Sequence, residues 1–597
     1  MFTVCVLLLY LVAQVASKTI HFDFNITTVL ANPDGLHERP VIGLNGQWPP
    51  PMIEASVGDV IVINARNLLL PDQPISLHFH GISMKGTPHM DGASQVSQCG
   101  ILPGKEFEYI FQVPDPGTYW YHAHDHAQIA NGLRGLLIVR DPEPPYASDY
   151  DEEIFLSVSD WFHDPVSDLL SRSSDENSMS TAPVPDAILL NDRHELHINA
   201  GSGKKYLVRL VNIGASTGHY FHIADHELTV VEVDGVYTKH TTTEGLHLAP
   251  GQRYSFLMNA KNESKRGYRI IITPDLEVVT SSTTIATGWI EYGTAASADE
   301  NETGPTHFQP ADILDDVSLM PLDGHPVLDP PSRTITLEVN MYTSEDGTES
   351  LAFNNSQYTG SDVPTLYTAL ATKRKSVDPA IYSPSINPFV LEQDEVVELV
   401  INNHLPTRQT FHLHGQKFQI VYRSKAGAGP FLHGEDQEGN HPLSPVRRDT
   451  IMVNGGGSVV LRFKADNPGV WLLESPTSQS WPSRLAATFI VSPLELQRTL
   501  SLSSIPIPFA DACTEDGVSL IMATPLPVEG LRTPADSIKD GLIYPLIYLV
   551  VFGAALPTTA VLLWPGIRWC AEGLVVKVYG IGAYRPVMDR SLMEKLP

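Results

Sequence analysis

Three short segments of the sequence each contain two histidines separated by one residue. The pairs are His78 with His80, His122 with His124, and His412 with His414. Because residues i and i+2 of a β-strand point to the same face, each segment presents two imidazoles to one side. Neutral imidazole is a preferred ligand of copper, zinc and iron. One such pair is weak evidence, but three pairs, two of them followed by glycine, predict a multinuclear metal site.

The segments that must position these histidines have the pattern of β-sandwiches. Turn residues recur about every 8–12 residues. Between them, runs such as 59–64 and 205–212 alternate between apolar and polar residues or are apolar throughout. In each third of the chain, a strand with an asparagine near its end precedes a histidine-bearing strand. Such a repeat predicts an all-β fold of tandem sandwiches. The repeated pairs are Asn64 with His78, Asn212 with His222, and Asn402 with His412.

The composition favours a large, acidic, globular chain. Its 597 residues leave room for roughly three to four domains. The formal net charge of −29, from 39 Lys and Arg against 68 Asp and Glu, disfavours nucleic acids as partners. The 42% of apolar residues excludes a mostly disordered chain, and 47 prolines favour short strands over long helices.

Shifts in composition divide the body of the chain into three units. A proline-rich stretch at Asp141–Pro145 and a polar stretch at 296–331 mark the boundaries. After the third unit the sequence is rich in proline, serine and threonine, which predicts a loosely ordered stalk. We place the units at residues 18–145, 150–295 and 332–495, and the stalk at 496–540.

The two ends of the chain predict a type I single-pass membrane protein of the cell surface or an endomembrane. Residues 1–17 resemble a signal peptide without a charged start, and a core segment is the alternative. Residues 541–567 carry no charge and are long enough for a transmembrane helix. Basic residues within 568–597 place that tail in the cytosol. A removable tail or a hydrophobic docking segment is the alternative to the anchor.

Cysteines and glycosylation sequons fit an oxidising compartment. Cys5 falls in the predicted signal peptide and Cys570 lies at the membrane edge. Cys99 and Cys513 therefore remain for a disulfide, with two free buried thiols as the alternative. The sequons begin at Asn25, Asn262, Asn301 and Asn354.

The histidine pairs stand in longer motifs that resemble those of fungal-type multicopper oxidases, over about residues 20 to 495. The body is more similar to laccases, including those of pigment pathways, whereas a C-terminal anchor resembles the iron-oxidase branch. The matching motifs are His78-Phe-His-Gly81 with Asp91-Gly92 and Tyr109, Tyr119-Trp-Tyr-His-Ala-His124, Val231–Gly235, Pro250–Ser255, Arg447-Arg-Asp-Thr450 and Ala465–Trp471.

The resemblance implies three tandem cupredoxin-like Greek-key β-sandwich domains, with a three-copper cluster between the first and the third. It also implies an interdomain disulfide between Cys99 and Cys513. Carried over by position, the copper ligands would be His78 and His412 for the type 2 ion, His80 and His122 for one type 3 ion, and His124 and His414 for the other.

The sequence departs from the family at the type 1 copper ligands, which would fall at Gln409, Ser475 and Ser480, and at one imidazole of each type 3 copper, which would fall at Glu474 and Pro476. The departures are Gln409 for a histidine, Glu474 for a histidine, Ser475 for the cysteine, Pro476 for a histidine and Ser480 for a histidine. Leu485 and Phe489 keep the family's register, which favours a lost site over the alternative of a misread exon.

These departures predict a reduced number of copper ions. A type 1 site needs a thiolate and two imidazoles, and serine is not deprotonated near neutral pH. We therefore expect no blue copper and no electron relay to the oxygen site. Glu474 could supply a carboxylate ligand, which suits zinc or manganese better than cuprous ion.

Four further residues carry less weight. We expect His126 to support the site or face solvent, and His89 and His163 to be ordinary loop histidines. Asp91 could position a water at the cluster or form an Asp-Gly turn.

Two classes of function compete, and whether the chain is an enzyme stays open at this point. The first is a laccase-like oxidoreductase that binds copper and contributes to phenol oxidation in pigment or secondary-metabolite synthesis with impaired activity. The second is a non-catalytic metal-binding or assembly partner of an active oxidase. An iron-oxidase-like uptake component is a further alternative.

Overall fold

The computed structural model describes residues 17–69, 73–124, 128–165, 168–169, 184–262, 267–275, 286–292, 313–344, 347, 349–434, 442–476, 484–505 and 513. Within these ranges no helix is long and apolar enough to cross a membrane. Several predicted features lie outside the described residues. They are residues 1–16 of the predicted signal peptide, His126, Asn301, Ser480, residues 506–512 and 514–540 of the predicted stalk, the segment 541–567 and the tail 568–597.

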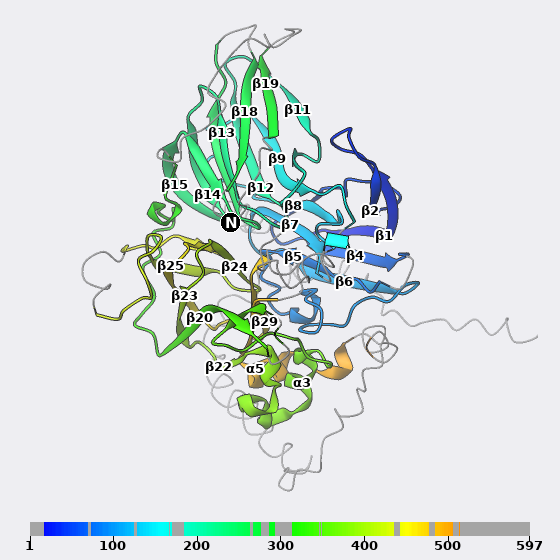
Figure 1. Cartoon of the computed structure of the whole chain (residues 1–597), viewed down its shortest axis with the longest axis vertical. Helices are drawn as coiled ribbons and strands as arrows, with labels where there is room; N and C mark the ends of the chain where they lie inside the picture. The colour runs from blue at the N-terminus through cyan, green and yellow to red at the C-terminus, as the bar shows by residue number, and fades with distance from the viewer. Residues whose placement is uncertain are drawn as a thin grey trace, which may run out of the picture. The chain divides into compact units, whose positions relative to one another are not determined.

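The first of three strand units contains two four-stranded sheets, with orders β2-β1-β4-β6 and β3-β8-β7-β5 (Figure 1). Strand β6 shows why the sheets pack. Its residues alternate between exposed and buried, so that one face is apolar. The strands are β1 (Thr19–Ala31), β2 (Arg39–Leu44), β3 (Ile53–Ser56), β4 (Val60–Asn67), β5 (Leu77–His80), β6 (Glu106–Gln112), β7 (Gly117–Ala123) and β8 (Arg134–Arg140).

The second unit has a six-stranded sheet, β10-β9-β12-β17-β14-β15, and a five-stranded sheet, β11-β19-β18-β13-β16. Its strands are β9 (Glu152–Trp161), β10 (Ala187–Leu190), β11 (Glu195–Ala200), β12 (Lys205–Asn212), β13 (His219–Ile223), β14 (Leu228–Val233), β15 (Val236–Thr243), β16 (Gly245–Leu248), β17 (Arg253–Asn259), β18 (Gly267–Pro274) and β19 (Ala286–Tyr292).

The third unit repeats the order of the second, with sheets β21-β20-β23-β28-β25-β26 and β22-β30-β29-β24-β27. Its strands are β20 (Arg333–Thr343), β21 (Glu349–Phe353), β22 (Pro388–Leu391), β23 (Val396–Asn403), β24 (Gln409–Leu413), β25 (Phe418–Arg423), β26 (Arg447–Arg448), β27 (Thr450–Val453), β28 (Ser458–Lys464), β29 (Gly469–Glu474) and β30 (Ala486–Val491).

Helices are few and short among the described residues. Gln497 on α5 donates a hydrogen bond to the carbonyl of Ala369 on α3 over 2.6 Å, so these two helices pack together beside the third unit. The helices are α3 (Thr365–Ala371) and α5 (Pro493–Thr499), with 3-10 turns η1 (Pro88–Met90), η3 (Asp316–Ser318), η4 (Lys373–Val377), η5 (Pro379–Ile381), η6 (Pro384–Ile386) and η7 (Leu502–Ser504).

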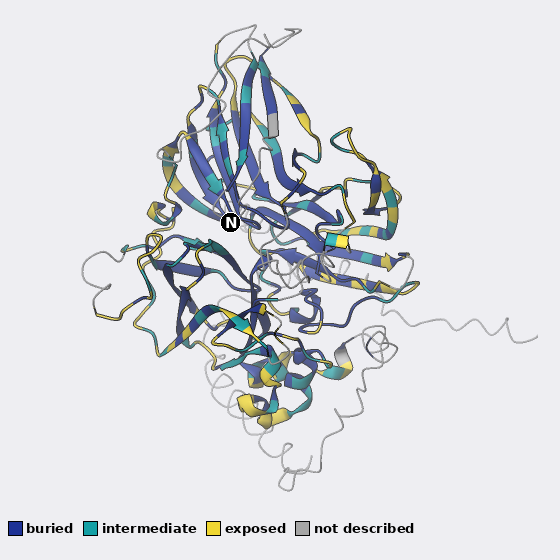
Figure 2. Ribbon diagram, in the orientation of Figure 1, coloured by how far each residue is buried: buried dark blue, intermediate teal, exposed yellow. Residues whose placement is uncertain are grey.

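Aromatic side chains from the two sheets of each unit meet in the core. In the first unit Phe79 of β5 lies 4.5 Å from Phe111 of β6, between ring centroids. In the third unit Phe353 of β21 lies 5.6 Å from Phe411 of β24. Figure 2 shows most strand residues as buried, with exposed residues mainly at the edges and turns. The predicted mostly-β, multidomain sandwich fold is therefore confirmed.

The predicted asparagine repeat exists, but two of its members were assigned wrongly. The repeated residues are Asn67, Asn212 and Asn403, the last residues of β4, β12 and β23. Each side-chain amide donates to two backbone carbonyls and accepts from the amide two residues later. Asn64 and Asn402 lie within strands, where spacing alone could not separate them from the loop-binding position. The repeated asparagine fixes the chain as it crosses from one sheet to the other.

Candidate metal centre

The histidine pairs of the first and third units come together at one buried place. β5 and β7 are antiparallel neighbours, with His78 opposite His122. β24 lies beside β29, with His412 opposite Glu474. The second histidine of the β7 and β24 segments follows directly after its strand. All six side chains are buried, with at most 3% of the residue surface exposed.

Ring distances show how closely the two units meet. The imidazole centroids of His80 and His412 are 3.6 Å apart, and those of His78 and His414 are 3.9 Å apart. The centroids of His124 and His414 are 5.1 Å apart. Residues of the first and the third unit, far apart in the sequence, therefore share one centre.

Two imidazole nitrogens of this centre are suited to a metal ion. Within the described residues, Nε2 of His78 and Nε2 of His412 are buried without a hydrogen-bond partner. A buried polar atom without a partner is costly unless something else satisfies it. Ligating atoms of His78, His80 and His412 all lie within 4.8 Å of one another. A set of neutral nitrogen donors fits copper, the metal that the sequence resemblance implies, and it fits zinc as well.

Hydrogen bonds on the opposite ring nitrogen orient these two imidazoles. Nδ1 of His78 donates to the backbone carbonyl of Asp91 over 2.7 Å. Nδ1 of His412 donates to the carbonyl of Asp449 over 2.9 Å. Such contacts fix the tautomer and leave Nε2 as the ligating atom. Asp91 thus supports the histidines directly, and its carboxylate also accepts from Nδ1 of His414 over 2.8 Å.

Burial keeps most of the imidazoles neutral. It lowers the pKa of His124 to about 3 and that of His412 to about 4. It also holds the pKa of His80 and of His122 well below the ordinary range. A neutral imidazole has a lone pair for a metal, so these four side chains are competent ligands at neutral pH.

His414 behaves differently from the other histidines. Burial alone would lower its pKa, but Asp91 and Glu474 on either side of the ring raise it to about 9. Its Nε2 lies 3.3 Å from Oε1 of Glu474. At neutral pH this ring is a protonated link between two carboxylates, and it must lose a proton before it can ligate.

Glu474 forms an ion pair that the sequence analysis did not anticipate. Its Oε2 accepts from Nη2 of Arg484 over 2.8 Å and from Nε over 3.1 Å. Its Oε1 accepts from Nε2 of His124 over 2.9 Å. Burial would raise the pKa of Glu474, but His124, Arg484 and His414 hold it well below its usual range. The sequence feature that could have indicated a buried role for Arg484 is its position as a lone charge before the apolar run Leu485-Ala-Ala-Thr-Phe489.

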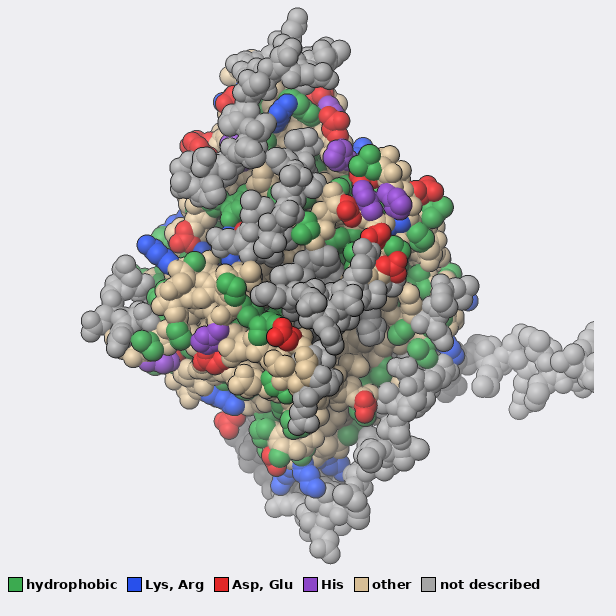
Figure 3. Space-filling model, in the orientation of Figure 1, with side chains coloured by type: hydrophobic (Ala, Val, Ile, Leu, Met, Phe, Trp, Pro, Cys, Tyr) green, Lys and Arg blue, Asp and Glu red, His purple; other side chains and the backbone are tan. Residues whose placement is uncertain are grey.

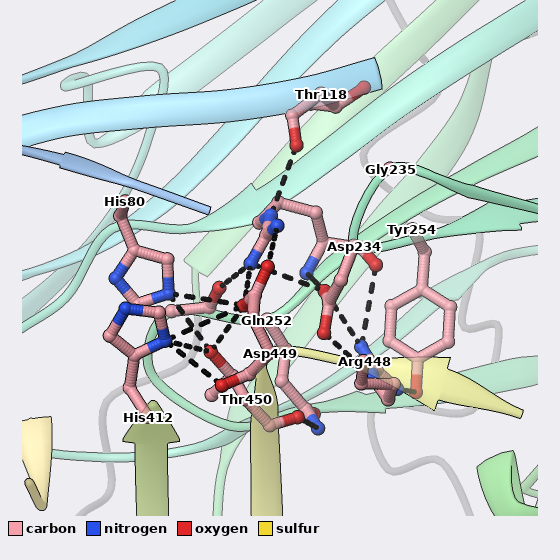
Figure 4. A network of polar contacts seen from close by, with 12 residues as sticks. His80, Thr118, Asp234, Gly235, Gln252, Tyr254, His412, Arg448, Asp449 and Thr450 are labelled. Atoms are coloured by element: carbon pink, nitrogen blue, oxygen red, sulfur yellow. Dashed lines mark hydrogen bonds and ion pairs between the residues drawn. The ribbon is translucent and has the colours of Figure 1, made fainter. Parts of the chain in front are cut away.

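A network of buried ions joins the second unit to this centre (Figure 4). Both terminal nitrogens of Arg253 contact the Asp449 carboxylate at 2.6 Å. Thr450 then places its hydroxyl 2.9 Å from Nε2 of His80 and 3.2 Å from Nδ1 of His412. Arg448 bonds Asp234 of the second unit over 2.7 Å. The motif Arg447–Thr450 was noted only as a family match, and its role here is to brace two of the histidines.

The glycines after two histidine pairs are required by close packing. Gly81 has a φ of +92°, and an added Cβ would lie 2.5 Å from Nη2 of Arg253. Gly415 has a φ of +65°, and an added Cβ would lie 2.3 Å from the ring of Trp471. Larger residues at these positions would displace the arginine that braces the centre or the tryptophan of β29.

The positions that would form a type 1 site hold other side chains. Gln409 begins β24 and its amide donates to the Thr407 hydroxyl over 3.3 Å. Ser475 is buried directly after β29, and its backbone N–H donates to the carbonyl of Leu485 over 3.0 Å. Neither side chain offers a thiolate or an imidazole, so they do not fit a blue copper ion.

Two other histidines singled out in the sequence, His163 and His89, lie among the described residues. His163 is partly buried and pairs with the buried carboxylate of Asp34 over 2.5 Å. His89 is buried in η1, and burial lowers its pKa to about 4. On the face drawn in Figure 3, acidic and basic side chains are scattered, apart from a small group of basic side chains at its lower end.

The predicted disulfide and the asparagines of three of the predicted glycosylation sequons lie among the described residues. Cys99 and Cys513 form a disulfide with Cα atoms 5.3 Å apart, which joins the first unit to the segment after the third. Of the sequons, Asn262 and Asn354 are exposed and Asn25 is partly buried.

Comparison with known proteins identifies the family. Multicopper oxidase family models match residues 25–144, 152–295 and 358–495. An iron transport multicopper oxidase of Epichloe festucae is 41% identical over 549 residues, which cover 90% of this chain and 87% of the relative. An iron transport multicopper oxidase of Saccharomyces cerevisiae is 36% identical over 83% of this chain and 79% of the relative.

Solved structures show the same relationship. The crystal structure of Fet3p, described as a multicopper oxidase that functions in iron import, has a TM-score of 0.80 at 33% identity and covers 86% of this chain and 100% of its own. A laccase from Botrytis aclada has a TM-score of 0.75 at 27% identity over 86% of this chain and 94% of its own. With three matching family models, a shared fold and relatives at 36–41% identity over most of its length, this chain belongs to the multicopper oxidase family.

Proposed function

We propose that this chain acts in iron handling as a metal-binding member of the iron-transport branch of its family, without turnover as a four-copper oxidase. The observation that carries the proposal is its similarity to relatives named iron transport multicopper oxidases, at 36–41% identity over 83–92% of the chain. The identity to a laccase of known structure is lower, at 27%. Phenol coupling, the first expectation from the sequence, has less support than this alternative.

Copper is the metal we propose for the centre, with His78, His80 and His412 as its first candidate ligands. Bound copper would supply one-electron redox chemistry at this site. The chain itself contributes burial that excludes water, carbonyl contacts that orient His78 and His412, and a proton held on His414 between Asp91 and Glu474.

Loss of the type 1 copper is part of the proposal. Gln409 and Ser475 replace ligands that a blue copper requires, and a hydroxyl is a poor ligand for cuprous ion. Without that ion an electron taken from a substrate has no relay of thiolate and imidazoles to the buried centre. We therefore infer that binding or delivery of metal, and not reduction of oxygen, is the surviving role.

We also propose that the chain passes through the secretory pathway and is anchored by residues 541–567. The Cys99–Cys513 disulfide supports an oxidising compartment, because such bonds are rare in the cytosol. The apolar start of the chain and its sequons support the same placement. This location would expose the body of the protein to extracellular or lumenal metal.

A deletion strain tests the function directly. We expect deletion to lower uptake of radioactive iron under iron limitation and to leave phenol oxidation unchanged. The full chain should restore uptake, a His78→Ala, His412→Ala variant should not, and a variant of the exposed His325, His325→Ala, should restore it fully. Unchanged iron uptake with reduced phenol oxidation would reverse the assignment in favour of a laccase-like role.

A further inference from the structure

The ion pair between Glu474 and Arg484 lies inside the histidine centre and not on the surface. The side chain of Glu474 is 3% exposed and that of Arg484 is 19% exposed. Glu474 ends β29 directly opposite His412, while Arg484 enters the same place from the start of the strand β30 segment. The guanidinium also reaches within 3.4 Å of Nδ1 of His124. A fixed positive charge therefore stands among groups that could otherwise ligate metal.

The centre has two sides: one is formed by His124, His414 and Glu474, and the other by His78, His80 and His412. We propose that the Glu474–Arg484 ion pair takes the place of metal on the first side, so that the chain binds a single divalent ion on the second. This inference rests on the proposed function only in requiring that the histidine centre binds metal. It adds the number of ions, the side of the centre that holds the ion, and the residues that fill the other side.

The two sides differ in what the imidazole nitrogens face. Nε2 of His78 and Nε2 of His412 are buried without a hydrogen-bond partner among the described residues. By contrast, Nε2 of His124 and Nε2 of His414 both contact Oε1 of Glu474, at 2.9 and 3.3 Å. The second side thus has two open nitrogens, with Nε2 of its third imidazole, His80, lying 2.9 Å from the Thr450 hydroxyl, whereas on the first side the Glu474 carboxylate already satisfies both rings.

Charge supports the same division. His124, His414 and Glu474 are near enough to one another to hold an ion by distance alone. However, Arg484 contacts the other oxygen of that carboxylate over 2.8 Å and supplies a cation of its own. A divalent ion at this position would stand close to the guanidinium in a buried environment, where like charges repel strongly. On the second side, no hydrogen-bond donor contacts Nε2 of His78 or Nε2 of His412 among the described residues, and the Arg253 guanidinium has both terminal nitrogens on the Asp449 carboxylate.

The test is the number of ions bound by the purified full chain after removal of metal and reconstitution with Cu²⁺ alone or Zn²⁺ alone. Elemental analysis should give about one ion for each chain. With Cu²⁺, all bound copper should be visible by electron paramagnetic resonance, because a lone cupric ion has no neighbour with which its spin can pair. The Arg484→Met variant, which removes the charge and keeps the length, should bind at least one further ion.

Three variants make the result interpretable. Arg484→Lys keeps the charge and should still bind one ion. Glu474→His combined with Arg484→Met should bind more than one, and it provides a second route if the single variant folds poorly. Arg498→Met removes an exposed arginine that pairs with Glu495 on α5 and should change nothing.

Two results would overturn this inference and leave the proposed metal-binding function standing. One is two or three ions in the unaltered chain, and the other is a single ion in both folded variants that carry Arg484→Met. No bound metal in the unaltered chain would overturn the metal-binding function and this inference together. The count for the unaltered chain therefore separates the two failures.

Discussion

Arg253 of the second unit and Asp449 of the third form a two-pronged ion pair in which both N–O distances are 2.6 Å. Neither side chain is more than 2% exposed. The backbone carbonyl of Asp449 accepts from Nδ1 of His412, so the pair connects the second unit to the metal centre. The second unit has none of the six histidines, yet it braces the centre.

Removal of Arg253 should destabilise the protein strongly. The variant Arg253→Met leaves a buried carboxylate without its cation, and breaking a buried pair in this way costs about 3–5 kcal/mol. We expect a lower apparent melting temperature and a faster loss of bound metal to a chelator. The matched control is Arg447→Met, whose pair with Asp323 is more exposed, and exposed pairs contribute roughly 0–1 kcal/mol. Equal effects of the two variants would show that Arg253 does not brace the centre.

Stability should fall as the pH drops from 6.5 towards 4, in part through His89. Burial lowers the pKa of His89 from its ordinary value of 6.5 to about 4. Between these values the unfolded chain binds a proton that the folded chain does not, so acid favours unfolding. The His89→Gln variant should show a flatter dependence of the melting temperature on pH in this window. The exposed His325→Gln variant serves as control and should keep the original slope.

Most of the fold and the six histidines of the centre followed from sequence patterns. Alternation of apolar residues predicts strands, and i, i+2 spacing places two imidazoles on one face. The spacing could not show which asparagine of a strand holds the next loop, because Asn64 and Asn67 both suit a strand end. That choice depends on carbonyls of Gln73 and Ile101, which only the folded chain brings near.

The parts of the site that sequence reasoning missed are long-range polar contacts. Arg484 lies ten residues from Glu474, but its contact with His124 spans 360 positions. Arg253 and Asp449 belong to different units, and each alone is compatible with an ordinary surface charge. A charged residue inside an otherwise apolar motif was the available signal, and it indicates a buried partner without identifying it.

Loss of the Cys99–Cys513 disulfide should lower stability while leaving the histidine centre intact. The bond closes a loop of 414 residues, and removal of a native disulfide typically costs about 2–5 kcal/mol. A Cys99→Ala, Cys513→Ala variant should melt at a lower temperature than the unaltered chain and bind the same amount of metal. Addition of reductant should lower the melting temperature of the unaltered chain and leave that of the double variant unchanged. A response of both proteins to reductant would contradict this role.

Gly81→Ala should impair the centre more than an equally strained glycine elsewhere. Gly81 and Gly86 have φ values of +92° and +81°, so alanine meets a similar backbone penalty at both, roughly 1–2 kcal/mol. Only at Gly81 would the new Cβ meet Arg253 and Tyr119, at 2.5 and 2.8 Å, whereas nothing lies within 4 Å at Gly86. We expect a larger drop in melting temperature and weaker metal retention for Gly81→Ala. If both variants lost the same amount of melting temperature and metal retention, Gly81 would matter only for its backbone conformation and not for the space it leaves to Arg253.

The copper-loaded chain should lack the intense blue absorption of a type 1 site, because that absorption requires a copper thiolate. The single variant Ser475→Cys should not restore it, since Gln409 and Ser480 still offer no imidazole. The triple variant Gln409→His, Ser475→Cys, Ser480→His supplies one thiolate and two imidazoles at the family's positions, and we expect it to gain the blue band. The matched control Gln409→His, Ser475→Ala, Ser480→His should remain colourless. Blue absorption from the unaltered chain would instead require another thiolate, and Cys99 and Cys513 are already joined to each other.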